Sequence, residues 1–79
     1  MLSAEEYESL KSDREHIFRW KETGSYRGNA MQTIDYIRQR RGYPSICYSC
    51  DGSKEEALKD AYNLMVEYEK NCAETVKNG

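Results

Sequence analysis

A segment of twelve residues, Gly42–Ser53, limits the folds open to this chain more than any other stretch. It reads Gly-Tyr-Pro-Ser-Ile-Cys-Tyr-Ser-Cys-Asp-Gly-Ser, and it holds the only proline and two of the three cysteines. Proline has no amide hydrogen and glycine has a large backbone freedom, so a continuous helix through this segment is not expected. We call Gly42–Ser53 the hinge; it separates a basic middle region from an acidic C-terminal third.

Capping signals and helical periodicity predict two helices before the hinge. The first covers about residues 4–22: it begins at a capping box made by Ser3 and Glu6, and it ends before Gly24. The second covers about residues 30–41, with Asn29 as its N-cap. Arginines crowd its last turn, where cations suit the negative end of the helix dipole.

A third helix is predicted after the hinge, over about residues 54–76, starting at a capping box of Ser53 and Glu56. Its apolar stripe consists of Leu58, Ala61, Tyr62, Met65, Tyr68, Cys72 and Val76. Together the patterns predict an all-α fold, a small three-helix bundle with an irregular hinge between its second and third helices. We expect residues 1–79 to form a single helical domain.

The predicted core is thin. Large aliphatic residues are few, and charged residues make up 33% of the chain, more than the usual quarter or so. A core of this size contributes only about 3–5 kcal/mol unless something else stabilises it. We therefore expect the chain to associate with itself, for example as a homodimer, or to bind a larger protein.

Arginine and tyrosine concentrate in the middle of the chain, where residues 11–50 carry eight Lys/Arg against four acids. This charge could pair with the acidic flanks, or it could meet a partner. Both residue types are frequent hot spots of protein interfaces, so the sequence favours a protein partner. The candidate contact residues are Tyr26, Arg27, Tyr36, Arg38, Arg40, Arg41, Tyr43 and Tyr48.

Nucleic acid is the alternative partner for the basic stretch 27–41, because arginine binds phosphate and tyrosine stacks on bases. A helix-turn-helix protein usually reads bases from the N-terminal part of its recognition helix. In the helix predicted at 30–41 the basic residues lie at the other end, after Ala30, Met31 and Gln32. The sequence therefore ranks nucleic acid behind protein.

Cys47 and Cys50 form a Cys-x-x-Cys pair that allows three interpretations. The pair could hold half of a zinc site, but His16 and Cys72 lie too far along their helices to complete four ligands, so two chains would have to share the metal. The pair could also be a thiol–disulfide centre. In the simplest interpretation both thiols pack as small apolar groups inside an irregular loop, and the protein needs no cofactor.

The sequence shows no catalytic signature. Glu15 precedes the lone His16, but adjacent helical residues point about 100° apart, so they do not pair. We find no phosphate-binding glycine loop and no Ser/His/Asp set, and we expect a protein that is not an enzyme. The chain has no run of about 18 apolar residues, its first residues are acidic, and its cysteine number is odd; these features predict a cytoplasmic protein without a membrane span.

The hinge and its flanks, Arg40-Arg41-Gly-Tyr-Pro-Ser-Ile-Cys-Tyr-Ser-Cys followed by a capped helix, resemble small Cys-x-x-Cys helical proteins encoded by tailed phages. The resemblance covers roughly residues 34–66. It implies a viral accessory protein that acts in the host cytoplasm, for example as an inhibitor of a host defence protein.

Overall fold

The computed structural model describes residues 2–78, with side chains described for residues 2–72. It contains four helices: α1 (Ala4–Lys11), α2 (Arg14–Thr23), α3 (Met31–Arg40) and α4 (Asp51–Asn78). Residues 2–78 contain no strand, so the predicted all-α class is confirmed. The predicted number of helices is wrong, because the helix expected over 4–22 is divided into α1 and α2.

The division lies at Ser12 and Asp13. The capping box at Ser3 forms as predicted, but the N–H groups of Ser12 and Asp13 both donate to the carbonyl of Leu10, which ends α1. The Asp13 carboxylate accepts hydrogen bonds from Ala30 N–H and the Tyr26 hydroxyl instead of capping α2. Serine and aspartate compete with the helical backbone for hydrogen bonds, and here a distant segment supplies the donors.

The starts of α3 and α4 also differ from the prediction. Ala30, not Asn29, occupies the N-cap position of α3, and its N–H is held by Asp13 and Tyr26. Helix α4 begins at Asp51, two residues before the predicted cap. Ser53 therefore lies inside the helix, where its hydroxyl accepts a hydrogen bond from Cys47 N–H at 3.1 Å.

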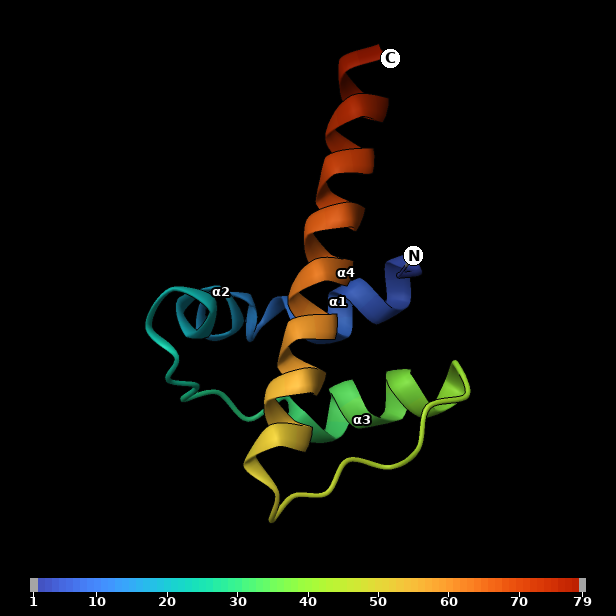
Figure 1. Cartoon of the computed structure of the whole chain (residues 1–79). Coiled ribbons are helices and arrows are strands. Elements are labelled where there is room, and N and C mark those ends of the chain that lie inside the picture. Colours follow the sequence, from blue (N-terminus) through green and yellow to red (C-terminus); the bar gives the residue numbers. More distant parts are fainter. Residues whose placement is uncertain (1, 79) are drawn as a thin grey trace.

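Helix α4 is the long axis of the molecule; α3 lies across its N-terminal part, and α1 and α2 lie across its middle (Figure 1). It packs against α2 and α3, while α1 packs against α3. The C-terminal part of α4 projects beyond the other helices (Figure 1). Among the described residues, no helix combines the length and apolar character that crossing a bilayer requires.

The core lies where the shorter helices meet α4. Its most completely buried large side chains are Leu10, Ile17, Ile34 and Met65. The predicted stripe of α4 is confirmed at Leu58, Ala61 and Met65, which are buried, and at Tyr62 and Tyr68, which pack against the core. Cys72 is wrong as a member of this stripe because it is exposed beyond the other helices, and the side chain of Val76 lies outside the described residues.

An ion pair joins α4 to the first two helices. Glu69 accepts two hydrogen bonds from the Arg14 guanidinium, at 2.6 and 2.8 Å, and a third from the Tyr7 hydroxyl at 2.6 Å. The Arg14 hydrogen bonds hold the pKa of Glu69 below its ordinary value of 4.5; burial acts in the opposite direction and the Tyr7 bond adds to the lowering. The ring of Tyr7 also stacks on Tyr68, with centroids 4.4 Å apart.

This ion pair predicts acid-sensitive stability. A carboxylate with a depressed folded pKa stabilises the fold above about pH 4.5, and the contribution is lost as pH falls through the folded pKa. We expect Glu69→Gln to lower the free energy of unfolding by about 1 kcal/mol at pH 7, a modest value because the side chain is partly exposed. The difference should shrink toward pH 3 in urea unfolding followed by circular dichroism. Glu67→Gln, at an exposed position of the same helix, is the control, and a pH-independent effect of Glu69→Gln would contradict the ion-pair explanation.

Candidate functional site

Exposed tyrosines concentrate in the second half of α3 and in the hinge. Tyr36 is 62% exposed, and Tyr43 and Tyr48 are each 47% exposed. Within residues 2–72 the other exposed large hydrophobic side chain is Val66 on α4. We refer to Tyr36, Tyr43 and Tyr48 as the tyrosine surface. All three belong to the contact residues expected from the sequence.

A buried carboxylate fixes the hinge against α3. Asp35 accepts hydrogen bonds from Ile46 N–H at 3.0 Å and from the Tyr48 hydroxyl at 3.1 Å. Burial raises the pKa of Asp35, but the hydrogen bonds from Ile46, Gln39 and Tyr48 outweigh it and leave the pKa below its ordinary value. With Ile46 in the core, these bonds give the ring of Tyr48 a defined position on the surface.

Arg38 does not lie on the surface, contrary to the expectation that it contacts a partner. It is 6% exposed, and its Nε lies 3.2 Å from Asp60 Oδ2 of α4, without the alignment of a hydrogen bond. A second acid, Glu56, lies 4.0 Å from its Nη2. The guanidinium also lies 4.9 Å from the ring centre of Tyr43, so a cation–π contact holds this exposed ring against Arg38.

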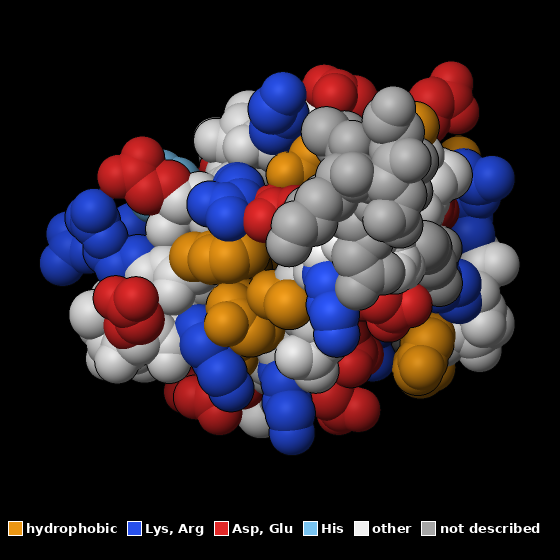
Figure 2. All heavy atoms as spheres, turned by 90° about the horizontal axis from the view of Figure 1, so that it is seen from above, with side chains coloured by type: hydrophobic (Ala, Val, Ile, Leu, Met, Phe, Trp, Pro, Cys, Tyr) orange, Lys and Arg blue, Asp and Glu red, His pale blue; other side chains and the backbone are white. Residues whose placement is uncertain are grey.

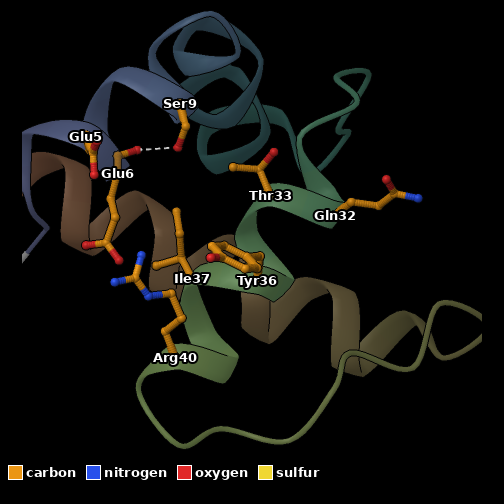
Figure 3. Close-up of a pocket in the computed structure, with 8 residues that line it drawn as sticks. All are labelled: Glu5, Glu6, Ser9, Gln32, Thr33, Tyr36, Ile37 and Arg40. Carbon is orange, nitrogen blue, oxygen red and sulfur yellow. Dashed lines mark hydrogen bonds between the residues drawn. The ribbon is translucent and has the colours of Figure 1, made fainter.

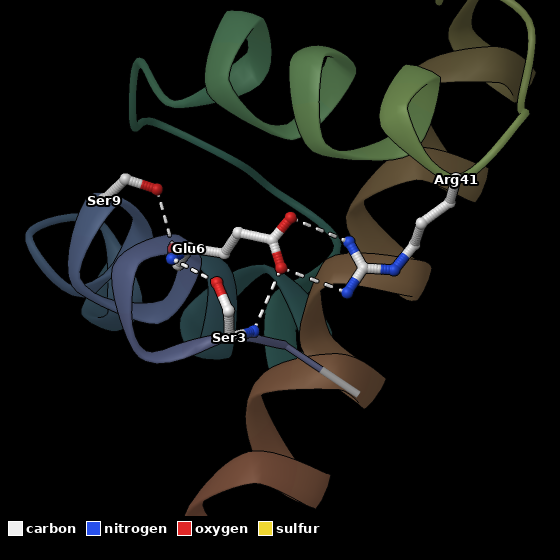
Figure 4. A network of polar contacts seen from close by, with 4 residues as sticks. All are labelled: Ser3, Glu6, Ser9 and Arg41. Atoms are coloured by element: carbon white, nitrogen blue, oxygen red, sulfur yellow. Dashed lines mark hydrogen bonds and ion pairs between the residues drawn. The ribbon is translucent and has the colours of Figure 1, made fainter.

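Arg41 is likewise engaged within the molecule. Its two terminal nitrogens donate to the two carboxylate oxygens of Glu6 at 3.1 and 3.2 Å, and Glu6 also closes the capping box with Ser3 (Figure 4). The hydrogen bond from Ser3 N–H, followed by those from Arg41, lowers the pKa of Glu6. Arg41, which was expected to contact a partner, thus connects α1 to the C-terminal end of α3 through its ion pair with Glu6.

Tyr36 and Arg40 border a groove between α1 and α3 with a volume of about 410 Å³. Figure 3 shows Tyr36 and Arg40 on the α3 side and Glu5, Glu6 and Ser9 on the α1 side, with Ile37 between them. The Arg40 guanidinium lies 5.7 Å from the ring centre of Tyr36. Here an exposed arginine and an exposed tyrosine from the predicted contact residues lie side by side.

Tyr26 and Arg27 lie apart from the tyrosine surface. The Tyr26 hydroxyl binds Asp13 and accepts from Ala30 N–H, and burial, followed by the bond to Asp13, raises its pKa. Tyr26 therefore has a structural role inside the molecule, and its expected contact with a partner stays a prediction. Arg27 is exposed and borders a separate hollow with His16 and Arg19 of α2.

Two acids that position this region, Asp13 and Asp35, were not among the residues singled out from the sequence. Both are buried, at 6% and 8% exposure, and both accept hydrogen bonds from backbone N–H groups far along the chain. The neighbouring Ile34 is apolar, but it does not signal the burial of Asp35, because adjacent helical residues point about 100° apart. Their partners depend on tertiary contacts that the sequence pattern does not reveal.

The two hinge thiols are exposed, so the interpretation of Cys47 and Cys50 as packed loop residues is wrong. Core packing in the hinge comes from Ile46 instead. Among the residues whose side chains are described, no group of three or more His, Cys, Asp and Glu could hold a metal ion. A four-cysteine zinc site would therefore take two thiolates from each of two chains.

The basic stretch 27–41 is partly neutralised by acids of other helices. Arg38 faces Asp60 and Glu56, and Arg41 is paired with Glu6. The opposite end of the molecule, seen from the C-terminal end of α4, likewise has Lys and Arg side chains interspersed with Asp and Glu (Figure 2). A surface of mixed sign attracts a phosphate backbone weakly.

In comparisons with known proteins, no family model, no curated protein and no solved structure matches this chain.

Proposed function

We propose that this protein is a non-enzymatic binding module that recognises another protein through the tyrosine surface and Arg40. The observation that carries the proposal is the exposure of three tyrosines within residues 36–48. Tyrosine offers a large, rigid apolar area together with a hydroxyl, which is why it is frequent in interfaces. A partner that fits this surface presents apolar side chains to the rings and a carboxylate to Arg40.

The tyrosines are held in place before any partner binds. Tyr48 is fixed by Asp35, Tyr43 lies over Arg38, and Tyr36 lies beside Arg40. Side chains that are already ordered lose less conformational entropy on binding. The resemblance to small tailed-phage proteins suggests a host protein as the partner, with inhibition as the result of binding.

The test is affinity capture with the immobilised full chain, followed by measurement of the dissociation constant for the purified partner. We expect Tyr43→Ala and Tyr36→Ala each to weaken binding by about 10- to 30-fold, the effect of losing a hot-spot side chain. Neither substitution removes a buried group, so the helical circular dichroism should not change. Arg41→Ala is a poor probe, because it breaks the pair with Glu6.

Val66→Ala is the matched control, since Val66 is exposed on α4 outside the tyrosine surface. It should change the dissociation constant by less than about threefold, within the usual range for peripheral residues. Tyr48→Phe keeps the ring and removes the hydroxyl that binds Asp35, so it separates the contribution of the ring from that of the hydroxyl. Partner binding that is equally tight in all the tyrosine variants would rule the proposal out.

A further inference from the structure

The hinge places two thiols at the start of the longest helix. Cys50 directly precedes Asp51, the first residue of α4, and its carbonyl accepts from Lys54 N–H in the first turn. The N–H of Cys50 donates to the carbonyl of Cys47 at 3.1 Å, and a turn covers the two residues between them. Such a turn keeps its first and last Cα atoms within about 7 Å, which is close to the range that a disulfide spans.

The sulfur of Cys47 has a polar neighbour within the turn. The Ser49 hydroxyl lies 3.4 Å from it, within hydrogen-bond distance for sulfur. The hydrogen bond from the Cys50 thiol, followed by those from Ser49, lowers the pKa of Cys47. The same contact with Cys47 raises the pKa of Cys50. The contact with Ser49 at 3.4 Å gives Cys47 different surroundings from Cys50, although both thiols are exposed.

We propose that Cys47 and Cys50 form a thiol–disulfide exchange site, in which Cys47 is the attacking thiol and Cys50 the resolving thiol. The chemical class of its reactant is a disulfide, either a small molecule such as oxidised glutathione or an exposed disulfide of a protein. This site lies beside the tyrosine surface, but its chemistry does not depend on the function proposed for that surface.

The exchange balances in two steps. The Cys47 thiolate attacks one sulfur of oxidised glutathione, a mixed disulfide forms, and the first glutathione leaves as a thiolate. Cys50 then loses its proton, and its sulfur attacks the Cys47 sulfur, which releases the second glutathione. The two protein thiols are oxidised to one disulfide while one glutathione disulfide is reduced to two thiols, and the thiol protons pass to the medium or to the released thiolates.

The first experiment measures alkylation by iodoacetamide at pH 7, with each cysteine followed by peptide mass spectrometry in the full chain. Cys72 is the internal reference, since it is exposed on α4 outside the hinge. We expect Cys47 to react at least about fivefold faster than Cys72, because more of it is thiolate at this pH. Rates for Cys47 equal to or below that of Cys72 would overturn the assignment of the attacking thiol.

The second experiment uses oxidised glutathione and a Cys72→Ser background. The chain with both hinge cysteines should lose two hydrogen atoms and retain no glutathione, whereas Cys50→Ser should retain one glutathione on Cys47. Glutathione that persists on Cys47 when Cys50 is present would refute the resolving step. Thiols that react only after a chelator is added would show instead that a metal holds them, and this outcome also overturns the proposal.

Discussion

Asp13→Ala is expected to lower the free energy of unfolding by about 2–4 kcal/mol, because it removes the carboxylate that accepts from two hydrogen-bond donors, each worth about 1–3 kcal/mol when left unpaired. These donors are Ala30 N–H, 3.0 Å from Asp13 Oδ2, and the hydroxyl of Tyr26. Ala30 N–H retains its contact with the Tyr26 oxygen at 2.8 Å, which sets the effect below the full sum. Urea unfolding followed by circular dichroism at pH 7 measures it.

Three further variants separate the hydrogen bonds from the packing around Asp13. Asp13→Asn keeps an acceptor oxygen and should have the smaller effect, and Tyr26→Phe should lose about 1 kcal/mol. Gly28→Ala adds a Cβ that meets the Asp13 carboxylate and lies 2.7 Å from the Tyr26 hydroxyl, so it should also destabilise the fold. The loss of stability caused by Gly28→Ala should be smaller in a chain that also carries Asp13→Ala and Tyr26→Phe. An unchanged loss would contradict the close packing of Gly28 against Asp13 and Tyr26.

Met65→Ala should produce a loss of similar size, about 2–4 kcal/mol, because it opens a cavity in the centre of the core. Met65 is fully buried on the face of α4 that the shorter helices cover. In a domain of this size a loss of about 2–4 kcal/mol lowers the melting temperature by at least about 10 °C, which thermal unfolding measures.

Val66→Ala is the matched control for Met65→Ala. The two residues are adjacent in α4, but Val66 is 38% exposed whereas Met65 is 0% exposed. An exposed substitution of this kind should change the free energy of unfolding by less than about 0.5 kcal/mol. Equal effects at both positions would show that the face of α4 assigned to the core is wrong.

Much of the secondary structure could be predicted from local signals. The capping box at Ser3 forms because its donors and acceptors lie within four residues of one another. The left-handed Gly24 ends α2 where the glycine predicted a stop, with φ +79°. The apolar stripe of α4 faces the core from Leu58 to Tyr68, since helical periodicity alone decides which residues share a face.

The break at Ser12 and Asp13 could not be located in this way. Leu10 and Ile17 lie seven residues apart and are both fully buried, as expected for a continuous helix. At this break the Asp13 side chain accepts hydrogen bonds from Tyr26 and Ala30, which are distant in sequence. A hint was present in the weak helical propensity of Ser12 and Asp13.

The exposure of the candidate contact residues was predicted in part. Tyr36, Arg40, Tyr43 and Tyr48 are exposed, as a contact role requires, and that role stays a prediction. Tyr26, Arg38 and Arg41 have polar or charged partners inside the molecule. The sequence does not distinguish these two groups, because the residues around an arginine or tyrosine in the chain do not show whether an acid from another segment lies next to it in the fold.

The sequence by itself determined that the chain is helical, that the hinge interrupts it, and which face of α4 turns inward. These features depend on propensity, capping and periodicity, which act over a few residues. Tertiary structure alone decided which tyrosines and arginines stay at the surface and that both hinge thiols are exposed. The physical reason is that a charged or polar group is buried where another segment of the chain supplies a hydrogen bond or an opposite charge, as for Asp13, Asp35 and Arg38 here.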